Sequence, residues 1–142
     1  MSYAMTRAER EAFLADTRVG ILAVQQPRRG PLAVPVWYHY APGTVVRVVT
    51  GPDSEKARLL RAAGRASLTV QSEQAPYQYV HVEGRITFGE PDPERDIRAM
   101  AIRYLGEQMG QAYLAMTADQ PAVLVELRPE RWRSVDYRKM GV

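Results

Sequence analysis

The chain has 142 residues, of which 46% are hydrophobic and 25% charged, with a formal net charge of +3. A chain of this length and balance suits one globular domain, over residues 1–142, and excludes a disordered or fibrous protein. The absence of cysteine excludes disulfides, zinc knuckles, iron–sulfur clusters and thiolate nucleophiles. With only two histidines in addition, we expect no metal site.

The helical signals begin at Thr6-Arg7-Ala8-Glu9, a capping box that predicts a short helix ending near Asp16. The apolar, β-branched run 19–24 predicts a buried strand, followed by a turn at 27–31. Alternation along 32–40 predicts its hairpin partner. This strand places two sets of residues on opposite faces, Val34, Val36, Tyr38 and Tyr40 on one and Pro35, Trp37 and His39 on the other.

A third strand is expected at 45–50, and after it Ser54 can cap a helix that Gly64 ends. Strands resume at 66–70 and 77–88, where Gly84 indicates a bulge or the close approach of another backbone. The later part contains a helical region from Pro91 with breaks at Gly106 and Gly110, and then a last strand at 122–128. This order predicts a mainly β, α+β fold, a six-stranded antiparallel barrel with peripheral helices.

The first thirteen residues, MSYAMTRAEREAF, are charged where a signal peptide is apolar. No later stretch approaches the roughly 18 apolar residues that span a bilayer. We therefore expect a cytoplasmic protein without a membrane partner. The positive charge comes mainly from arginine, which suits phosphate and carboxylate groups, whereas so mild an excess without a basic stripe does not favour nucleic acid.

Residues 50–58 form the stretch most informative about chemistry, because a strand ends there in a turn and a capped helix begins with two cations. Free amides and the positive end of the helix dipole would receive a phosphate group. The Ser54 hydroxyl would donate a hydrogen bond to it, while Lys56 and Arg58 would neutralise its charge. In the alternative interpretation Ser54 is only an N-cap and the two cations only form a solvated face.

Aromatic residues form a second candidate set. Trp37, beside Pro35 on the less apolar face of its strand, can line a flat ligand or simply pack in the core. Tyr77 and Tyr79 share a face and can stack on a ligand or a partner chain, or belong to an ordinary sheet surface.

Motifs of the common protein-only enzymes are absent: the chain has no Gly-x-Gly-x-x-Gly, Walker, Gly-x-Ser-x-Gly or His-Glu-x-x-His sequence. A hydrolase that uses only protein groups is therefore not expected. His39 and His81 each lie in the middle of a strand, where a structural role is commoner than ligation. No carboxylate–histidine pair identifies a catalytic acid, so the catalytic residues remain unknown.

Four segments in succession carry a family resemblance: EREAFL (9–14), TRVGILAV (17–24), GPLAVPVWY (30–38) and SEKARLL (54–60). Their order resembles the pyridoxamine 5′-phosphate oxidase-like split β-barrel superfamily, and within it the B-type flavin/deazaflavin oxidoreductases. The resemblance runs from about Thr6 to Val135. It implies a homodimer in which both subunits build each of two cofactor sites, with FMN or the deazaflavin coenzyme F-420 as cofactor and hydride transfer as the chemistry.

The resemblance also implies site residues. The cofactor ring would lie along Val34, Pro35, Val36 and Trp37, the ribityl chain beside Val49 and Thr50, and the phosphate on Ser54, Lys56 and Arg58. Gln71 would come from the neighbouring strand, and the other subunit would contribute a wall of Tyr77, Tyr79 and Trp132.

Spare arginines favour the deazaflavin. Arg28, Arg29 and Arg61 would extend the anion contacts to the phosphodiester and glutamate tail of coenzyme F-420. We therefore expect an F-420-dependent oxidoreductase that transfers a hydride to a conjugated small organic substrate. An FMN-binding protein or a non-catalytic ligand-binding barrel is the alternative. A barrel that binds single-stranded nucleic acid is a third interpretation, which the mild net charge disfavours. Vitamin B6 oxidation is not expected, because the arginine-rich strands that bind both FMN and a phosphorylated substrate are not evident in this sequence.

Overall fold

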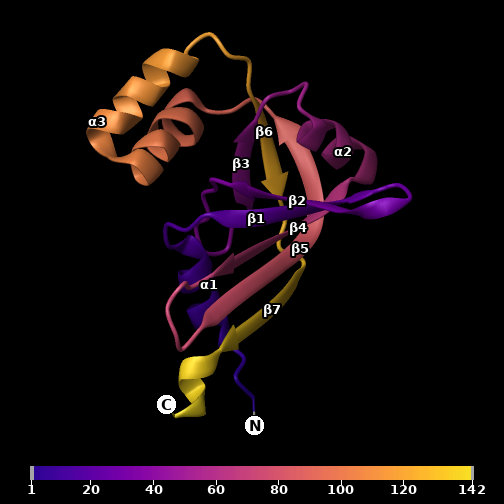
Figure 1. Cartoon of the computed structure of the whole chain (residues 1–142), viewed down its shortest axis with the longest axis vertical. Helices are drawn as coiled ribbons and strands as arrows, with labels where there is room; N and C mark the ends of the chain where they lie inside the picture. Colours follow the sequence, from indigo (N-terminus) through magenta and orange to yellow (C-terminus); the bar gives the residue numbers. More distant parts are fainter. Residues whose placement is uncertain (1, 142) are drawn as a thin grey trace.

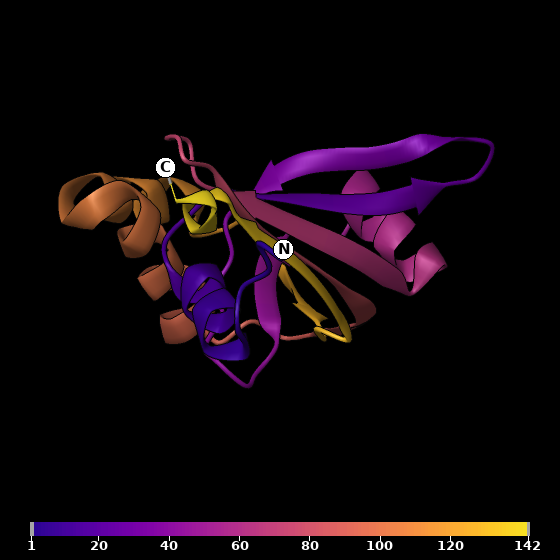
Figure 2. The same ribbon diagram turned by 90° about the horizontal axis from the view of Figure 1, so that it is seen from below.

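A computed structural model describes residues 2–141 (Figures 1 and 2). Its elements follow in chain order: α1 (Arg7–Ala15), β1 (Gly20–Gln26), β2 (Arg29–Val36), β3 (Val46–Thr50), α2 (Glu55–Ala63), β4 (Arg65–Gln71), β5 (Gln78–Gly89), the π-helix η1 (Pro93–Arg98), α3 (Ala99–Thr117), β6 (Val123–Leu127), β7 (Arg131–Asp136) and the 3₁₀ helix η2 (Tyr137–Met140).

Local capping sets the ends of the first two helices, as the sequence predicts. The Thr6 hydroxyl accepts the Glu9 amide at 3.2 Å, and the Glu9 carboxylate accepts the Thr6 amide at 2.7 Å. At the start of α2 the Ser54 hydroxyl accepts the Ala57 amide at 3.1 Å. Gly64 ends α2 with a φ of 71°, a left-handed conformation that glycine adopts without strain.

The strands form an antiparallel, split β-barrel in the order β2-β1-β4-β5-β6-β3, with β7 paired to β5. The sequence predicts six strands, and the structure adds β7 as a seventh. Its outward positions carry Arg131 and Arg133, so the strand lacks the apolar alternation that identifies the others.

Gly84 allows β5 to serve both halves of the barrel. Around this residue the partners of β5 change: it pairs with β7 as far as Glu83 and with β4 as far as Arg85, and from Ile86 it pairs with β6. A Cβ atom on Gly84 would overlap the carbonyl group of Arg128, where the chain passes from β6 to β7 across β5. The close backbone approach predicted at this glycine is therefore confirmed.

The segment after β2 closes the barrel. The sequence predicts a strand up to Tyr40, but β2 ends at Val36 because the Tyr38 amide donates to the Tyr104 hydroxyl at 3.0 Å instead of to a strand. One residue after Tyr38, His39 exchanges backbone hydrogen bonds of 3.0 and 2.9 Å with Arg47, which join this segment to β3.

The helical region between β5 and β6 stands at one end of the molecule (Figure 1). Gly106, with φ 81° and ψ 173°, divides α3 into two segments, as the sequence predicts. The break predicted at Gly110 is wrong. This glycine is helical and buried, and its missing side chain lets the second segment pack on Ile102 of the first.

The core lies between the two halves of the barrel. It is formed by the inward residues of all the long strands together with α1 and α2, among them Leu14, Leu22, Leu60, Leu68, Val80, Val82 and Leu127. Tyr38 is fully buried in it and donates its hydroxyl to the Leu14 carbonyl at 2.7 Å. No helix within residues 2–141 has the length and apolar character needed to cross a membrane.

We expect Gly84→Ala to lower the free energy of unfolding by at least about 2 kcal/mol, because backbone must move to admit the new methyl group. Urea denaturation measures the change. Gly89→Ala is the matched control, since Gly89 lies on the same strand with open space around it. Equal denaturation midpoints for the two variants would contradict the role given to Gly84.

Candidate functional site

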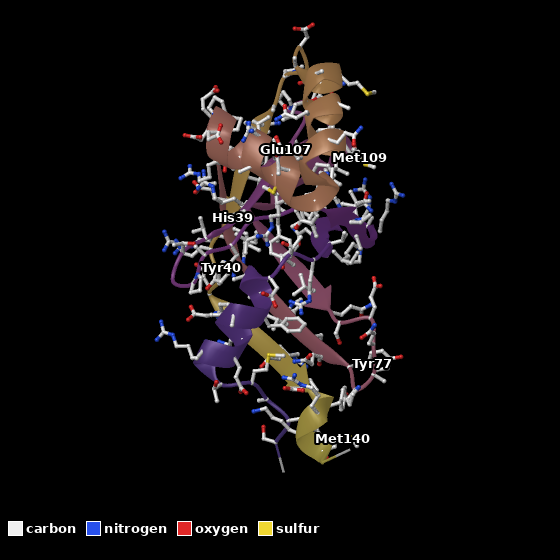
Figure 3. The ribbon with its side chains drawn as sticks, turned by 90° about the vertical axis from the view of Figure 1, so that its left-hand side faces the viewer. His39, Tyr40, Tyr77, Glu107, Met109 and Met140 are labelled. Atoms are coloured by element: carbon white, nitrogen blue, oxygen red, sulfur yellow. The ribbon has the colours of Figure 1, made fainter. Side chains whose placement is uncertain are left out.

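A cleft of about 510 Å³ opens between the end of β3 and the helices η1 and α3. From the barrel it is lined by Trp37, Val49 and Thr50, three of the residues that the sequence nominates for cofactor contact. The opposite side comes from the helices and includes Ile97, Met100, Tyr113 and Leu114. Figure 3 shows the second α3 segment, marked by Glu107 and Met109, above His39 of the barrel.

Trp37 is held in this cleft by the helical region. Its ring stacks on Tyr104, with centroids 5.2 Å apart and planes 4° from parallel, while Tyr113 approaches at 5.3 Å and a tilt of 56°. Tyr104 is itself anchored, since its hydroxyl lies 2.7 Å from the Arg18 carbonyl and accepts the Tyr38 amide. Trp37 is therefore a fixed, half-buried wall of the cleft and not part of the barrel core.

A buried ion pair attaches η1 to the barrel. Arg47 of β3 donates to both carboxylate oxygens of Asp96, at 2.8 and 2.9 Å, and to Glu126 at 2.6 Å. Burial alone would raise the pKa of Asp96, but the hydrogen bonds from Arg47 and from the Asp92 amide lower it overall. The sequence analysis did not single out this pair, although an arginine within the apolar strand VVRVVT signals the need for a buried anion.

The start of α2 is adjacent to the cleft. The Ser54 hydroxyl, besides capping the helix, lies 3.2 Å from the hydroxyl of Thr50, which lines the cleft. Lys56 lies on the same helical stripe as the buried residues Leu59 and Leu60 and is half-buried. Within residues 2–141 its ammonium group has no hydrogen-bond or ion-pair partner, and burial lowers its pKa.

Two arginines of this helix, Arg58 and Arg61, have different partners within the protein. Arg58 is exposed and is paired with Glu55, with 3.1 Å between Nε and Oε2. Arg61 donates to the Pro52 carbonyl at 2.7 Å and lies over the ring of Phe88, so neither side chain is free of protein contacts.

The β1–β2 hairpin brings two further cations to the same region. The hydrogen bond from Arg58, followed by the charges of Arg58 and Arg29, lowers the pKa of Glu55, so Arg29 lies near the start of α2. Figures 1 and 2 both show the hairpin extending past this helix. Across the part of the chain that the structure describes, neither Arg28 nor Arg29 has a carboxylate within ion-pair distance.

The other nominated residues lie on the sheet. Val34 and Val36 point into the barrel, whereas Pro35 faces outward in a cross-strand row with Ile21, Thr69 and His81. Gln71 and Tyr79 are paired neighbours on this outer face.

Trp132 and Tyr77 lie elsewhere. Trp132 pairs with Val82 and faces the opposite side of the sheet from Tyr79, with the Arg10 guanidinium 4.6 Å from its ring centroid. Tyr77 is exposed, at the end of the molecule remote from α3 (Figure 3). One chain therefore does not bring Tyr77, Tyr79 and Trp132 to the cleft.

The sequence profile of the pyridoxamine 5′-phosphate oxidase family matches residues 6–136. The chain belongs to this family. Among curated proteins, none matches the chain.

Solved structures share the family fold. A conserved hypothetical protein from Mycobacterium tuberculosis is 27% identical with a TM-score of 0.79, and the match covers 97% of this chain and 89% of that one. An F-420 reductase is 22% identical with a TM-score of 0.66, over 87% and 94% of the two chains. A FAD-binding protein from Mesorhizobium loti is 21% identical with a TM-score of 0.64, over 92% and 93%.

The residues present fit the anionic end of a cofactor of this family. A half-buried ammonium without a counter-ion is destabilised by the loss of water, and a bound phosphate would compensate it. Lys56 and the α2 amino terminus provide such a position beside Thr50. Trp37 lines the same cleft as Thr50 and gives it an aromatic wall.

We expect Asp96→Asn to lower the free energy of unfolding at pH 7 by about 3 kcal/mol, because it removes the charge that compensates Arg47. The folded state lowers the pKa of Asp96, so its stabilising effect is present above the unfolded value of about 3.9 and is lost as the pH falls below it. The difference between wild type and Asp96→Asn should therefore narrow below about pH 4.

Urea denaturation across this pH range measures the effect. Glu94→Gln is the control on the same helix, since its contact with Arg98 is exposed and should contribute less than about 1 kcal/mol. If Asp96→Asn is no more destabilising than Glu94→Gln, the ion pair does not hold η1 on the barrel.

Proposed function

We propose that this chain is an oxidoreductase that uses coenzyme F-420 to transfer a hydride to a conjugated small organic substrate. The observation that carries the proposal is Lys56 at the start of α2, which is half-buried and has no hydrogen-bond or ion-pair partner among residues 2–141. The cap of this helix, Ser54, contacts the cleft residue Thr50. The cofactor phosphate would bind there to the Lys56 ammonium and to the free amides at the helix start.

Different residues are proposed to contact the ring of the cofactor and the chain that links the ring to the phosphate. Pro35 and Trp37 present side chains to a ring lying over the strand, whereas Val34 and Val36 can contribute only backbone there, because their side chains point into the barrel. Val49 and Thr50 would contact the chain that links ring and phosphate. When bound in reduced form, such a cofactor supplies a hydride, that is two electrons with one proton.

The hairpin arginines favour coenzyme F-420 over FMN. FMN ends in a single phosphate, for which Lys56 and the helix start suffice. Coenzyme F-420 continues into a phosphodiester and glutamate carboxylates, and Arg28 and Arg29 of the β1–β2 hairpin have no carboxylate partners of their own within residues 2–141. Arginine is suited to both anions. Arg61 is less suited to this role because it already binds the Pro52 carbonyl.

A homodimer is part of the proposal. The outer face of the sheet exposes Val19 and Ile21 beside Gln71, around a hollow of about 670 Å³. A second copy on this face would bury the apolar side chains and would place Gln71 and Tyr79 against the partner. Tyr77, which is remote from its own cleft, could reach a cofactor only from the other subunit.

We expect Lys56→Ala to weaken cofactor binding by about tenfold to a hundredfold, corresponding to a lost charge-assisted contact of about 1–3 kcal/mol. Fluorescence titration of the purified protein with coenzyme F-420 and, in parallel, with FMN measures the change. Lys139→Ala is the matched control, because Lys139 pairs with Glu9 at the other end of the molecule. Equal affinities for the two variants would refute the anion site, and bound cofactor without turnover of a conjugated acceptor would indicate a non-catalytic binder.

The double substitution Arg28→Gln with Arg29→Gln should distinguish the two cofactors. Removing both exposed cations is expected to weaken F-420 binding by about fivefold, roughly 1 kcal/mol, and to leave FMN binding unchanged. The same titrations provide the measurement. An equal loss for both cofactors, or a loss for FMN alone, would overturn the assignment of the hairpin to the F-420 tail.

A further inference from the structure

The helical side of the cleft is formed by a segment that contacts the barrel at few points. The first part of α3 is anchored through Tyr104 and through Arg103, which donates to the Ala15 carbonyl at 3.0 Å. After Gly106 the second part folds back on the first through Gly110. From this second part Tyr113 reaches Trp37, so the two aromatic rings face the same space.

The chemistry of the lining is apolar and acidic. Its apolar side chains include those of Trp37, Met100, Tyr113 and Leu114, together with Ile97 of η1. The charged residues among the described lining are Glu90 and Asp96, and no lysine, arginine or histidine is among them. Arg47 and Arg95 neutralise Asp96, whereas Glu90 is exposed. The cleft therefore offers flat aromatic contact and one exposed carboxylate, with no cation in its described lining.

The cations lie outside this lining. Lys56 lies at the start of α2, where Arg29 of the β1–β2 hairpin acts on Glu55 through its charge, and Arg28 precedes Arg29 in that hairpin. Thr50, which lines the cleft, contacts the cap of that helix, Ser54. An anionic tail is attracted to the α2 end, and an anion placed in the cleft would meet like charge without a cation to pair with.

We propose that the helical side of the cleft is the substrate site and that it accepts a flat, apolar aromatic molecule that is neutral or cationic, while it rejects carboxylates and phosphates. Its role as the substrate site rests on the function proposed above. Tyr113 determines specificity, because its ring continues the aromatic wall beside Trp37 and about 40% of its surface is exposed, where a ligand can cover it. A phosphorylated substrate would be excluded by the same charges.

Three probes of one shape test the charge preference: naphthalene-2-carboxamide, 2-naphthoate and 2-naphthylmethylammonium. Isothermal titration calorimetry is carried out on the protein alone and on the protein saturated with coenzyme F-420. We expect the amide and the ammonium to bind at least about tenfold more tightly than the carboxylate. Carboxylate binding as tight as that of the amide, or no binding of the amide in either state, would overturn the proposal.

Variants of α3 test the location. Tyr113→Ala should weaken amide binding by about tenfold, whereas Tyr113→Phe should retain it because the ring and not the hydroxyl makes the contact. Met116→Ala is the control on the same segment, since Met116 is 81% exposed and does not line the cleft. Thermal melting shows that each variant is folded. A folded Tyr113→Ala protein with unchanged affinity, or loss of binding in Met116→Ala, would overturn the assignment.

Competition separates this proposal from the proposed function. If coenzyme F-420 displaces the amide probe, the cleft holds the cofactor ring and the substrate assignment is wrong. If the probes bind in the expected charge order but neither cofactor binds, the ligand class of the cleft is supported and the proposed function alone fails. If the cofactor binds in a Lys56-dependent manner and no probe binds, the proposed function stands and the present inference fails.

Discussion

The buried pair of Arg47 and Asp96 is the interaction on which the geometry of the site depends. It joins β3 of the barrel to η1, and through η1 to α3, so that an otherwise peripheral helical region stands over the end of β3. A buried ion pair contributes little net stability in general, since desolvation offsets attraction, but breaking it leaves a buried charge uncompensated. The main effect of the pair is therefore to hold η1 and α3 against β3, which determines where the cleft lies.

Charge is divided across the site in a way that suits two different ligands. At the start of α2 a half-buried lysine lacks a counter-ion among the described residues, and the hairpin adds exposed arginines. A few residues away, beyond Thr50, the lining becomes aromatic and acidic. It is on this division of charge that we propose an anionic cofactor tail at one end and a neutral or cationic aromatic partner at the other.

Much of the fold could be predicted from local signals, and the errors have physical causes. The capping residues Thr6 and Ser54 act within one helical turn, so their roles follow from neighbouring residues. Strand β7 was missed because arginines occupy its outward positions, and the apolar alternation on which prediction depends is absent. The sequence predicts a helix break at Gly110, because the sequence alone does not distinguish a glycine needed for close helix packing from a glycine that ends a helix.

The sequence by itself determined the order of the elements other than β7, the family, the cap at Ser54 and the presence of cations near it, because each of these depends on residues adjacent in the chain. Only the folded chain decided which of those cations have hydrogen-bond or ion-pair partners within the protein. Arg58 turns to Glu55 and Arg61 to Pro52, while Lys56 lies half-buried without a partner in residues 2–141. It also set Trp37 against Tyr104 and Tyr113, since contacts between residues so distant in sequence arise only when the barrel and the helices pack together.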